Sequence, residues 1–182
     1  MTTYDIFVQI LGLGAAAVFI LSFQVRANQL LFILQSTACV LFAIQFALLG
    51  GFTGCAGMLL VVARNLTLVM RERWAWVRHW SWMAFWLLIG TLNTWLTWDG
   101  LISLLPWFGT AGATVGYWSN NARNIRLANL LCCCPAWLLH NLLILSVGGI
   151  LNETIALMSI VISIYRYGWK NLGDPDFGKK EA

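Results

Sequence analysis

The residues of this chain that could do chemistry are polar side chains set within long apolar stretches. They are Arg64, Asn65, His140, Asn141 and Glu153. A polar side chain at membrane depth needs a hydrogen-bonding or charged partner, so each of the five is a functional candidate. We expect them to bind a small solute, and we expect no catalytic residue, cofactor or metal site.

Arg64 allows two interpretations. Its guanidinium group could offer a fixed positive charge, beside Asn65, to an anionic or strongly polar solute inside the membrane. Alternatively, the long side chain could extend along its helix until the charge reaches the cytoplasmic surface.

His140 and Glu153 suggest a second kind of chemistry. They lie on neighbouring apolar stretches, separated in the sequence by Gly148-Gly149, which we expect to be a turn. A carboxylate beside an imidazole raises the proton affinity of the imidazole and permits proton coupling. The alternative is a static hydrogen bond that fixes the last two stretches to each other.

The elements that must position these residues are seven apolar stretches. The chain is 60% hydrophobic and 10% charged, which excludes a soluble domain of its 182 residues. A helix rises ~1.5 Å per residue, so each stretch can cross an apolar slab ~30 Å thick. Inside a bilayer the backbone must satisfy its own hydrogen bonds, so we predict an all-α integral membrane protein with seven transmembrane helices. The stretches are 6–24, 29–49, 54–70, 80–98, 101–118, 127–147 and 151–168.

The positive charges predict the orientation. Ten of the eleven Lys and Arg residues lie at alternate breaks between the stretches or between residue 166 and the carboxyl terminus, and the intervening breaks carry none. Short basic loops remain cytoplasmic, so we expect the amino terminus outside and the carboxyl terminus in the cytoplasm. The same rule explains the net charge of +4 without a nucleic-acid partner.

A weak internal repeat relates the two ends of the chain. An offset of 98 positions aligns Gly14 with Gly112 and Gly50-Gly51 with Gly148-Gly149. We therefore expect one transmembrane domain over 1–182, built as 3+1+3 helices with two parallel repeats, an arrangement common in transporters. Its predicted parts are repeat 1 over 1–73, a linker helix over 74–100, repeat 2 over 101–170 and a cytoplasmic tail over 171–182.

Two local features predict how the helices pack. Small residues in the first and fifth stretches, among them Gly12, Gly14, Gly112 and Gly116, would let neighbouring helices approach closely. Pro135 lies inside the sixth stretch, where it removes a backbone hydrogen bond and should kink the helix.

Several motifs of this chain occur together in one known family. They are Trp137-Leu138-Leu139-His140-Asn141, Ser146-Val147-Gly148-Gly149 with Glu153 and Arg166, Leu104-Leu105-Pro106 with Gly109-Thr110, and Arg64. Through them most of the chain, and its second half most specifically, resembles the YgjV-type family of bacterial inner-membrane proteins. That family is in turn similar to the SWEET, PQ-loop and nicotinamide-riboside transporter group, which implies a SWEET/PQ-loop-like bundle. The Pro-Gln pair typical of PQ-loop proteins is replaced here by Ser22-Phe23-Gln24 and Trp118-Ser119-Asn120.

Two functions follow as hypotheses. The first is a carrier or facilitator of a small polar solute in the bacterial inner membrane, with a central polar cavity lined by the five candidate residues. The alternative is a membrane scaffold that transports nothing and interacts with lipids or assembly partners. An enzyme is not expected, because the chain lacks a carboxylate pair, a metal-ligand spacing and a nucleophile–base motif.

Overall fold

The computed structural model describes residues 3–48, 52–71, 73–96, 98, 100–143, 147–174 and 177. All regular structure within these ranges is helical, and no strand occurs there, which confirms the expected all-α class. The chain forms two compact units. Unit 1 comprises Met1–Val25 and Gln29–Val77, and unit 2 comprises Arg26–Asn28 and Arg78–Ala182.

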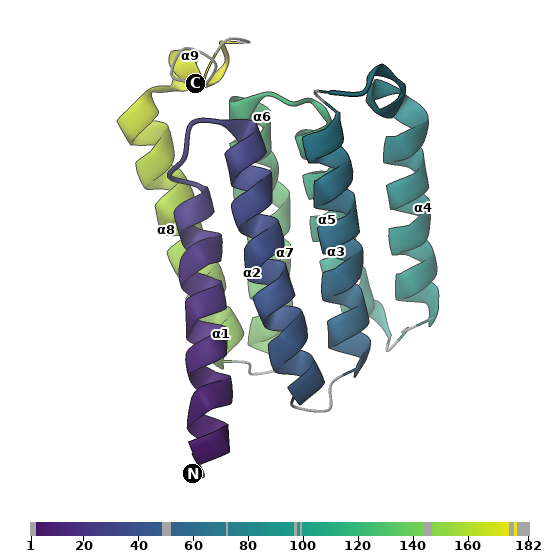
Figure 1. Ribbon diagram of the computed structural model, residues 1–182, viewed down its shortest axis with the longest axis vertical. Helices are drawn as coiled ribbons and strands as arrows, with labels where there is room; N and C mark the ends of the chain where they lie inside the picture. Colours follow the sequence, from purple (N-terminus) through teal and green to yellow (C-terminus); the bar gives the residue numbers. More distant parts are fainter. Residues whose placement is uncertain are drawn as a thin grey trace. The chain divides into compact units, whose positions relative to one another are not determined.

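Unit 1 is a group of three long helices, α1 (Thr3–Ser22), α2 (Asn28–Leu48) and α3 (Phe52–Met70), followed by the short 3-10 helix η1 (Ala75–Arg78) (Figure 1). Two contacts hold α1 against α2. The Tyr4 hydroxyl donates to the Leu48 carbonyl oxygen at 2.7 Å. Gly12 lies directly against the amide end of the Gln45 side chain, which would have to shift to admit a Cβ, whereas a Cβ at Gly14 would meet nothing within 4 Å.

Unit 2 contains the remaining helices. Its first part is α4 (Trp80–Leu96), the 3-10 helix η2 (Leu101–Ser103) and α5 (Leu104–Trp118). A continuous helical run follows, made of α6 (Ala122–Ala128), the π-helical segment η3 (Asn129–Cys133) and α7 (Cys134–Leu143). The unit ends with α8 (Val147–Tyr167) and the short α9 (Trp169–Leu172).

Helix α5 packs through a glycine face, as the small residues predict. A Cβ at Gly112 would lie 2.6 Å from the Cys132 Cβ, and one at Gly109 would lie 3.2 Å from the Cys133 carbonyl oxygen. At Gly116 the Ala128 Cβ blocks any side chain. Close backbone approach of this kind lets helices associate by van der Waals packing in an apolar medium. Helix α5 therefore lies in the interior of unit 2, against η3 and its flanking helices.

Helix α6 begins earlier than the apolar pattern predicts, at 122 rather than 127. Asn121 is its N-cap residue, and the Asn121 Oδ1 accepts from the backbone amides of Arg123 at 3.0 Å and Asn124 at 3.3 Å. A side-chain oxygen at this position satisfies amides that have no partner in the first turn. The cap, and not hydropathy, sets the start of the helix.

Pro135 is accommodated by a change of helix type. The π-helical segment η3 ends at Cys133, directly before the helix that contains Pro135. A proline cannot donate a backbone hydrogen bond and crowds the carbonyl oxygen four residues earlier, here that of Leu131. A π-helical turn widens the helix at that place. The sequence predicts a kink at Pro135, and the structure has a π-helical segment directly before it.

The turn predicted at Gly148-Gly149 is wrong. Both glycines lie in the first turn of α8, which starts at Val147, and residues 144–146 before it lie outside the described part of the chain. Glycine is required in a turn where the backbone adopts a positive φ, but it can also be part of a helix, as it is here. The predicted turn at Gly50-Gly51 also lies outside the described residues.

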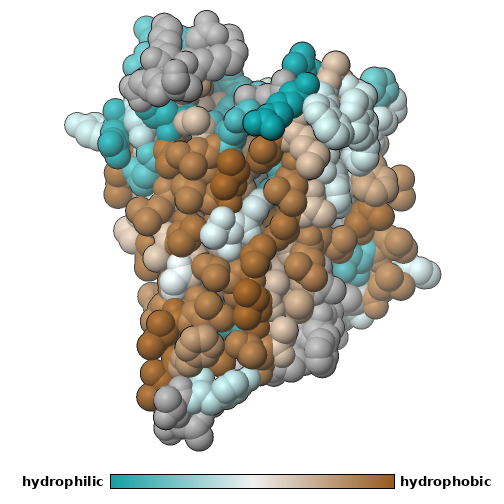
Figure 2. Space-filling view, in the orientation of Figure 1, coloured by the Kyte–Doolittle hydropathy of each residue, from teal (hydrophilic) through white to brown (hydrophobic). Residues whose placement is uncertain are grey.

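On the face of the molecule shown in Figure 2, apolar side chains cover the helices along most of their lengths, and hydrophilic residues gather mainly at the upper end. Exposed examples include Leu13 at 71%, Leu88 at 70% and Leu131 at 66% exposure. By length and composition, two described segments can cross a membrane, Asn28–Gln45 and Ile150–Tyr167, and Ile6–Ser22 and Gly57–Met70 are shorter apolar helices.

Candidate functional site

Unit 1 contains a buried polar cluster built around Arg64. The Arg64 side chain is only 7% exposed and donates from Nε at 3.4 Å and Nη2 at 3.1 Å to the Oδ1 of Asn65, which is fully buried. Cys39 on α2 lies close enough to interact with the charge of Arg64. The guanidinium group is therefore buried within unit 1 and bonded to its neighbour on α3.

Two buried amide donors accompany this charge. The Asn65 Oδ1 accepts from Arg64, and the Asn65 Nδ2 is buried with no hydrogen-bond acceptor. Gln35, 2% exposed, buries its Nε2 in the same unpaired state. Gln35 precedes Cys39 by four residues, so the two side chains share one face of α2.

An unpaired buried amide donor is costly, and a group that supplies an oxygen acceptor would relieve the cost. The cluster of Arg64, Asn65 and Gln35 is therefore rich in donors and suited to a ligand with carboxylate, phosphate or carbonyl oxygens. The sequence analysis predicted Arg64 and Asn65 as site residues, but not Gln35. The sequence does not show that the Gln35 Nε2 is buried without an acceptor, because burial depends on how the helices pack.

In unit 2 the predicted His140–Glu153 pairing is replaced by other contacts. The Glu153 carboxylate accepts from Asn152 Nδ2 at 3.3 Å and interacts with the Cys134 thiol across the α7–α8 contact. The His140 ring packs edge-on against Trp137, with centroids 5.6 Å apart. Among the described hydrogen bonds none joins His140 to Glu153, and the His140 Nδ1 is buried without a partner. Nothing is described for the side chain of Asn141, whose backbone lies in α7.

A polar network that the sequence did not predict runs between α5, α6 and α8. Arg126 was expected on the basic rim, yet its side chain is fully buried. Its Nε donates to Ser163 Oγ at 2.7 Å and its Nη1 to the Ala122 carbonyl oxygen at 3.2 Å. One turn further along, the Tyr117 hydroxyl donates to Asn129 Oδ1 at 3.0 Å. The only sequence signal for this burial was the four-residue spacing of Ser159 and Ser163 on one face of α8.

Buried polar clusters inside helices whose outer surfaces are apolar define a helical integral membrane protein. The comparison with protein families agrees. The chain belongs to the Imp-YgjV family of bacterial inner membrane proteins, whose model matches residues 6–171. No curated protein and no solved structure matches the chain. The resemblance inferred from the His140 and Gly148 motifs is thereby confirmed, and with it the location in the bacterial inner membrane.

Proposed function

We propose that this inner-membrane protein is a carrier or facilitator for a small solute that bears oxygen acceptors, such as a carboxylate or a phosphate. The observation that carries the proposal is the buried donor cluster of unit 1. Arg64 brings a positive charge there, and Asn65 Nδ2 and Gln35 Nε2 lack acceptors. Buried ionisable residues in membrane helices are expensive and mark solute or ion pathways.

The topology of the proposal is the one that the charge distribution indicates. Seven spans in a 3+1+3 arrangement, with the amino terminus outside, would place Arg64 within the third span. A described helix lies over each of the seven apolar stretches, which supports this arrangement. His140, Asn141 and Glu153 remain proposed solute contacts of the second half, and no catalytic step is proposed for any of them.

The test is thermal unfolding of the detergent-solubilised protein against a panel of organic acids, phosphorylated metabolites, sugars, nucleosides, vitamins and amino acids. A ligand at a hundred times its dissociation constant adds ~2.7 kcal/mol to the native state, a shift that is easily resolved. We expect an anionic compound to stabilise the wild type and to lose its effect in the Arg64→Gln and Gln35→Leu variants. The matched control is Arg73→Gln, which removes an exposed charge outside the cluster.

Two results would contradict the proposal. One is stabilisation by a compound that persists in a folded Arg64→Gln variant, because the bound solute would then not need the charge. The other is the lack of any shift across the whole panel, together with no uptake by proteoliposomes that contain the protein.

The second candidate is a membrane scaffold that transports nothing, and one observation favours it. Glu153 is engaged by Asn152 and Cys134, a static arrangement that ties α7 to α8 without an imidazole. In that case the wild type and the His140→Ala variant should respond alike to every compound of the panel, and neither should take up solute in proteoliposomes. Loss of solute binding in a folded His140→Ala variant would exclude the scaffold.

A further inference from the structure

Three arginine side chains surround a single aromatic ring at one end of unit 2. The guanidinium carbons of Arg26, Arg126 and Arg166 lie 5.8, 5.9 and 5.3 Å from the ring centroid of Tyr167, the last residue of α8. They come from three separate parts of the chain: the α1–α2 connection, α6 and α8 itself. The fold therefore brings together, around Tyr167, three positive charges, two of which belong to arginines far from α8 in the sequence.

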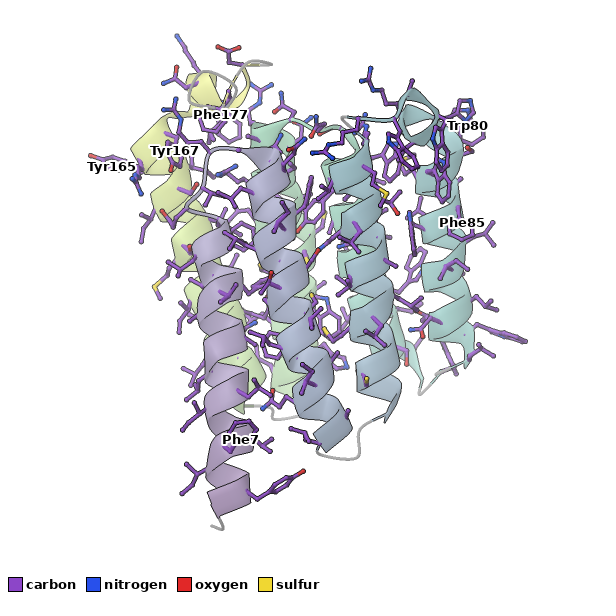
Figure 3. All side chains as sticks on the ribbon, viewed as in Figure 1. Phe7, Trp80, Phe85, Tyr165, Tyr167 and Phe177 are labelled. Atoms are coloured by element: carbon purple, nitrogen blue, oxygen red, sulfur yellow. The ribbon has the colours of Figure 1, made fainter. Side chains whose placement is uncertain are left out.

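The chain after α8 extends this arginine cluster. Phe177 packs edge-on against Tyr167 at 5.5 Å and lies under Arg26 at 5.1 Å (Figure 3). Arg123 stands 5.6 Å from the ring of Trp169. Asn121 Nδ2 donates to the Gly173 carbonyl oxygen at 3.1 Å, which anchors the segment against the start of α6. The arginine cluster is thus packed against, and held by, other residues of unit 2.

Positive charge predominates in this cluster. It contains four arginines, and Lys170 follows on α9. Asp174 is the one acidic residue described between 166 and 177, and the sequence adds Asp176. Contacts of exposed cations with aromatic rings are weak, and guanidinium groups this close repel one another. An anion bound among them would lower that repulsion.

The outer side of α8 places the cluster at the level of lipid headgroups. Val161 and Ile162 are 53% and 57% exposed, as expected of side chains that face acyl chains. Tyr165 is 91% exposed and points away from the bundle in Figure 3, and Trp169 is 44% exposed. Tyr and Trp concentrate at the boundary between acyl chains and water. The exposed Arg166 lies between these two residues in the sequence.

We propose that the arginine cluster around Tyr167 binds the phosphate headgroup of an anionic phospholipid of the inner leaflet. Arginine presents paired donors that match phosphate oxygens, and basic pockets between helices on the cytoplasmic side suit such headgroups. The exposed Arg166 offers the phosphate an approach from the bilayer, while Arg126 supplies charge from inside. The site is separate from the donor cluster of unit 1 and does not depend on a transport function.

The test follows thermal unfolding of the full chain in neutral detergent as lipid is added. Short-chain phosphatidylglycerol is the probe, short-chain phosphatidylcholine has the same phosphate without net charge, and inorganic phosphate represents a free anion. We expect phosphatidylglycerol alone to raise the unfolding midpoint. Each of the variants Arg26→Gln and Arg166→Gln should weaken its apparent affinity about fivefold, the effect expected of one arginine near an anionic lipid surface. Arg73→Gln is the matched control and should leave that affinity unchanged.

Three outcomes would overturn the proposal. Equal stabilisation by phosphatidylcholine would show that the acyl chains suffice. Equal stabilisation by inorganic phosphate would make the cluster a free-anion site. An affinity for phosphatidylglycerol that is the same in the wild type, Arg26→Gln and Arg166→Gln would place the lipid elsewhere. Both variants replace partly or fully exposed side chains and leave the buried Arg126 in place, so folding should be retained.

Discussion

Arg126 shows how a single charge is kept inside unit 2. A guanidinium group buried away from solvent needs hydrogen-bond acceptors for its donors. Arg126 has two such acceptors, Ser163 Oγ and the Ala122 carbonyl oxygen. The Tyr167 ring adds a favourable electrostatic contact. Arg126 joins α6 to α8 and also contributes to the arginine cluster.

The Ser163→Ala variant tests this arrangement. It leaves the Arg126 Nε without the acceptor at 2.7 Å, and an unsatisfied buried donor costs about 1–3 kcal/mol. We expect the free energy of unfolding in detergent to fall by that amount. The control is Thr154→Val on the same helix, because the exposed Thr154 hydroxyl donates only to the Ile150 carbonyl oxygen of its own helix. Equal losses in both variants would contradict a special role for Ser163.

At the scale of elements, the glycine face of α5 determines how unit 2 packs. Gly109, Gly112 and Gly116 lie against the continuous run formed by α6, η3 and α7. The same run contains the π segment before Pro135, so a helix with irregular hydrogen bonding packs against this glycine face. Dispersion contacts of this kind are individually small and need close backbone approach.

The same substitution at two glycines should have opposite effects. Gly112→Ala places a Cβ 2.6 Å from the Cys132 Cβ, and overpacking of this kind costs about 1–3 kcal/mol. Gly90→Ala, on α4, meets nothing within 4 Å and should gain up to about 1 kcal/mol of helix propensity. Thermal unfolding in one detergent compares the two variants. A stabilised Gly112→Ala variant would show that α5 and η3 separate more easily than the structure indicates.

At the scale of the whole molecule, membrane orientation is the property on which the proposed function depends. The basic residues lie at alternate breaks, so the carboxyl terminus should be cytoplasmic. A green fluorescent protein fused after residue 182 should fluoresce in intact cells, and alkaline phosphatase at the same place should be inactive. A phosphatase fused after residue 50 should be active. The reverse pattern would contradict the predicted orientation and, with it, an inner-leaflet lipid site.

Much of the helix framework can be read from the sequence. Apolar runs long enough to cross a bilayer determine where helices lie, and a helix was found over each predicted stretch. Boundaries are less predictable, because a local cap or the surrounding helix can override composition. Asn121 moves the start of α6 forward, and Gly148-Gly149 continues as helix although the pair resembles a turn.

The sequence by itself determined the class of this protein, the helical stretches, the basic ends and the polar candidates Arg64 and Asn65. Each of these depends on the chemistry of a residue and its near neighbours. Only the tertiary structure decided that Gln35 buries its Nε2 without an acceptor, that Glu153 interacts with Cys134 and that three arginines meet at Tyr167. A polar side chain in an apolar helix needs a partner, and which partner it finds depends on the helix faces that packing brings together.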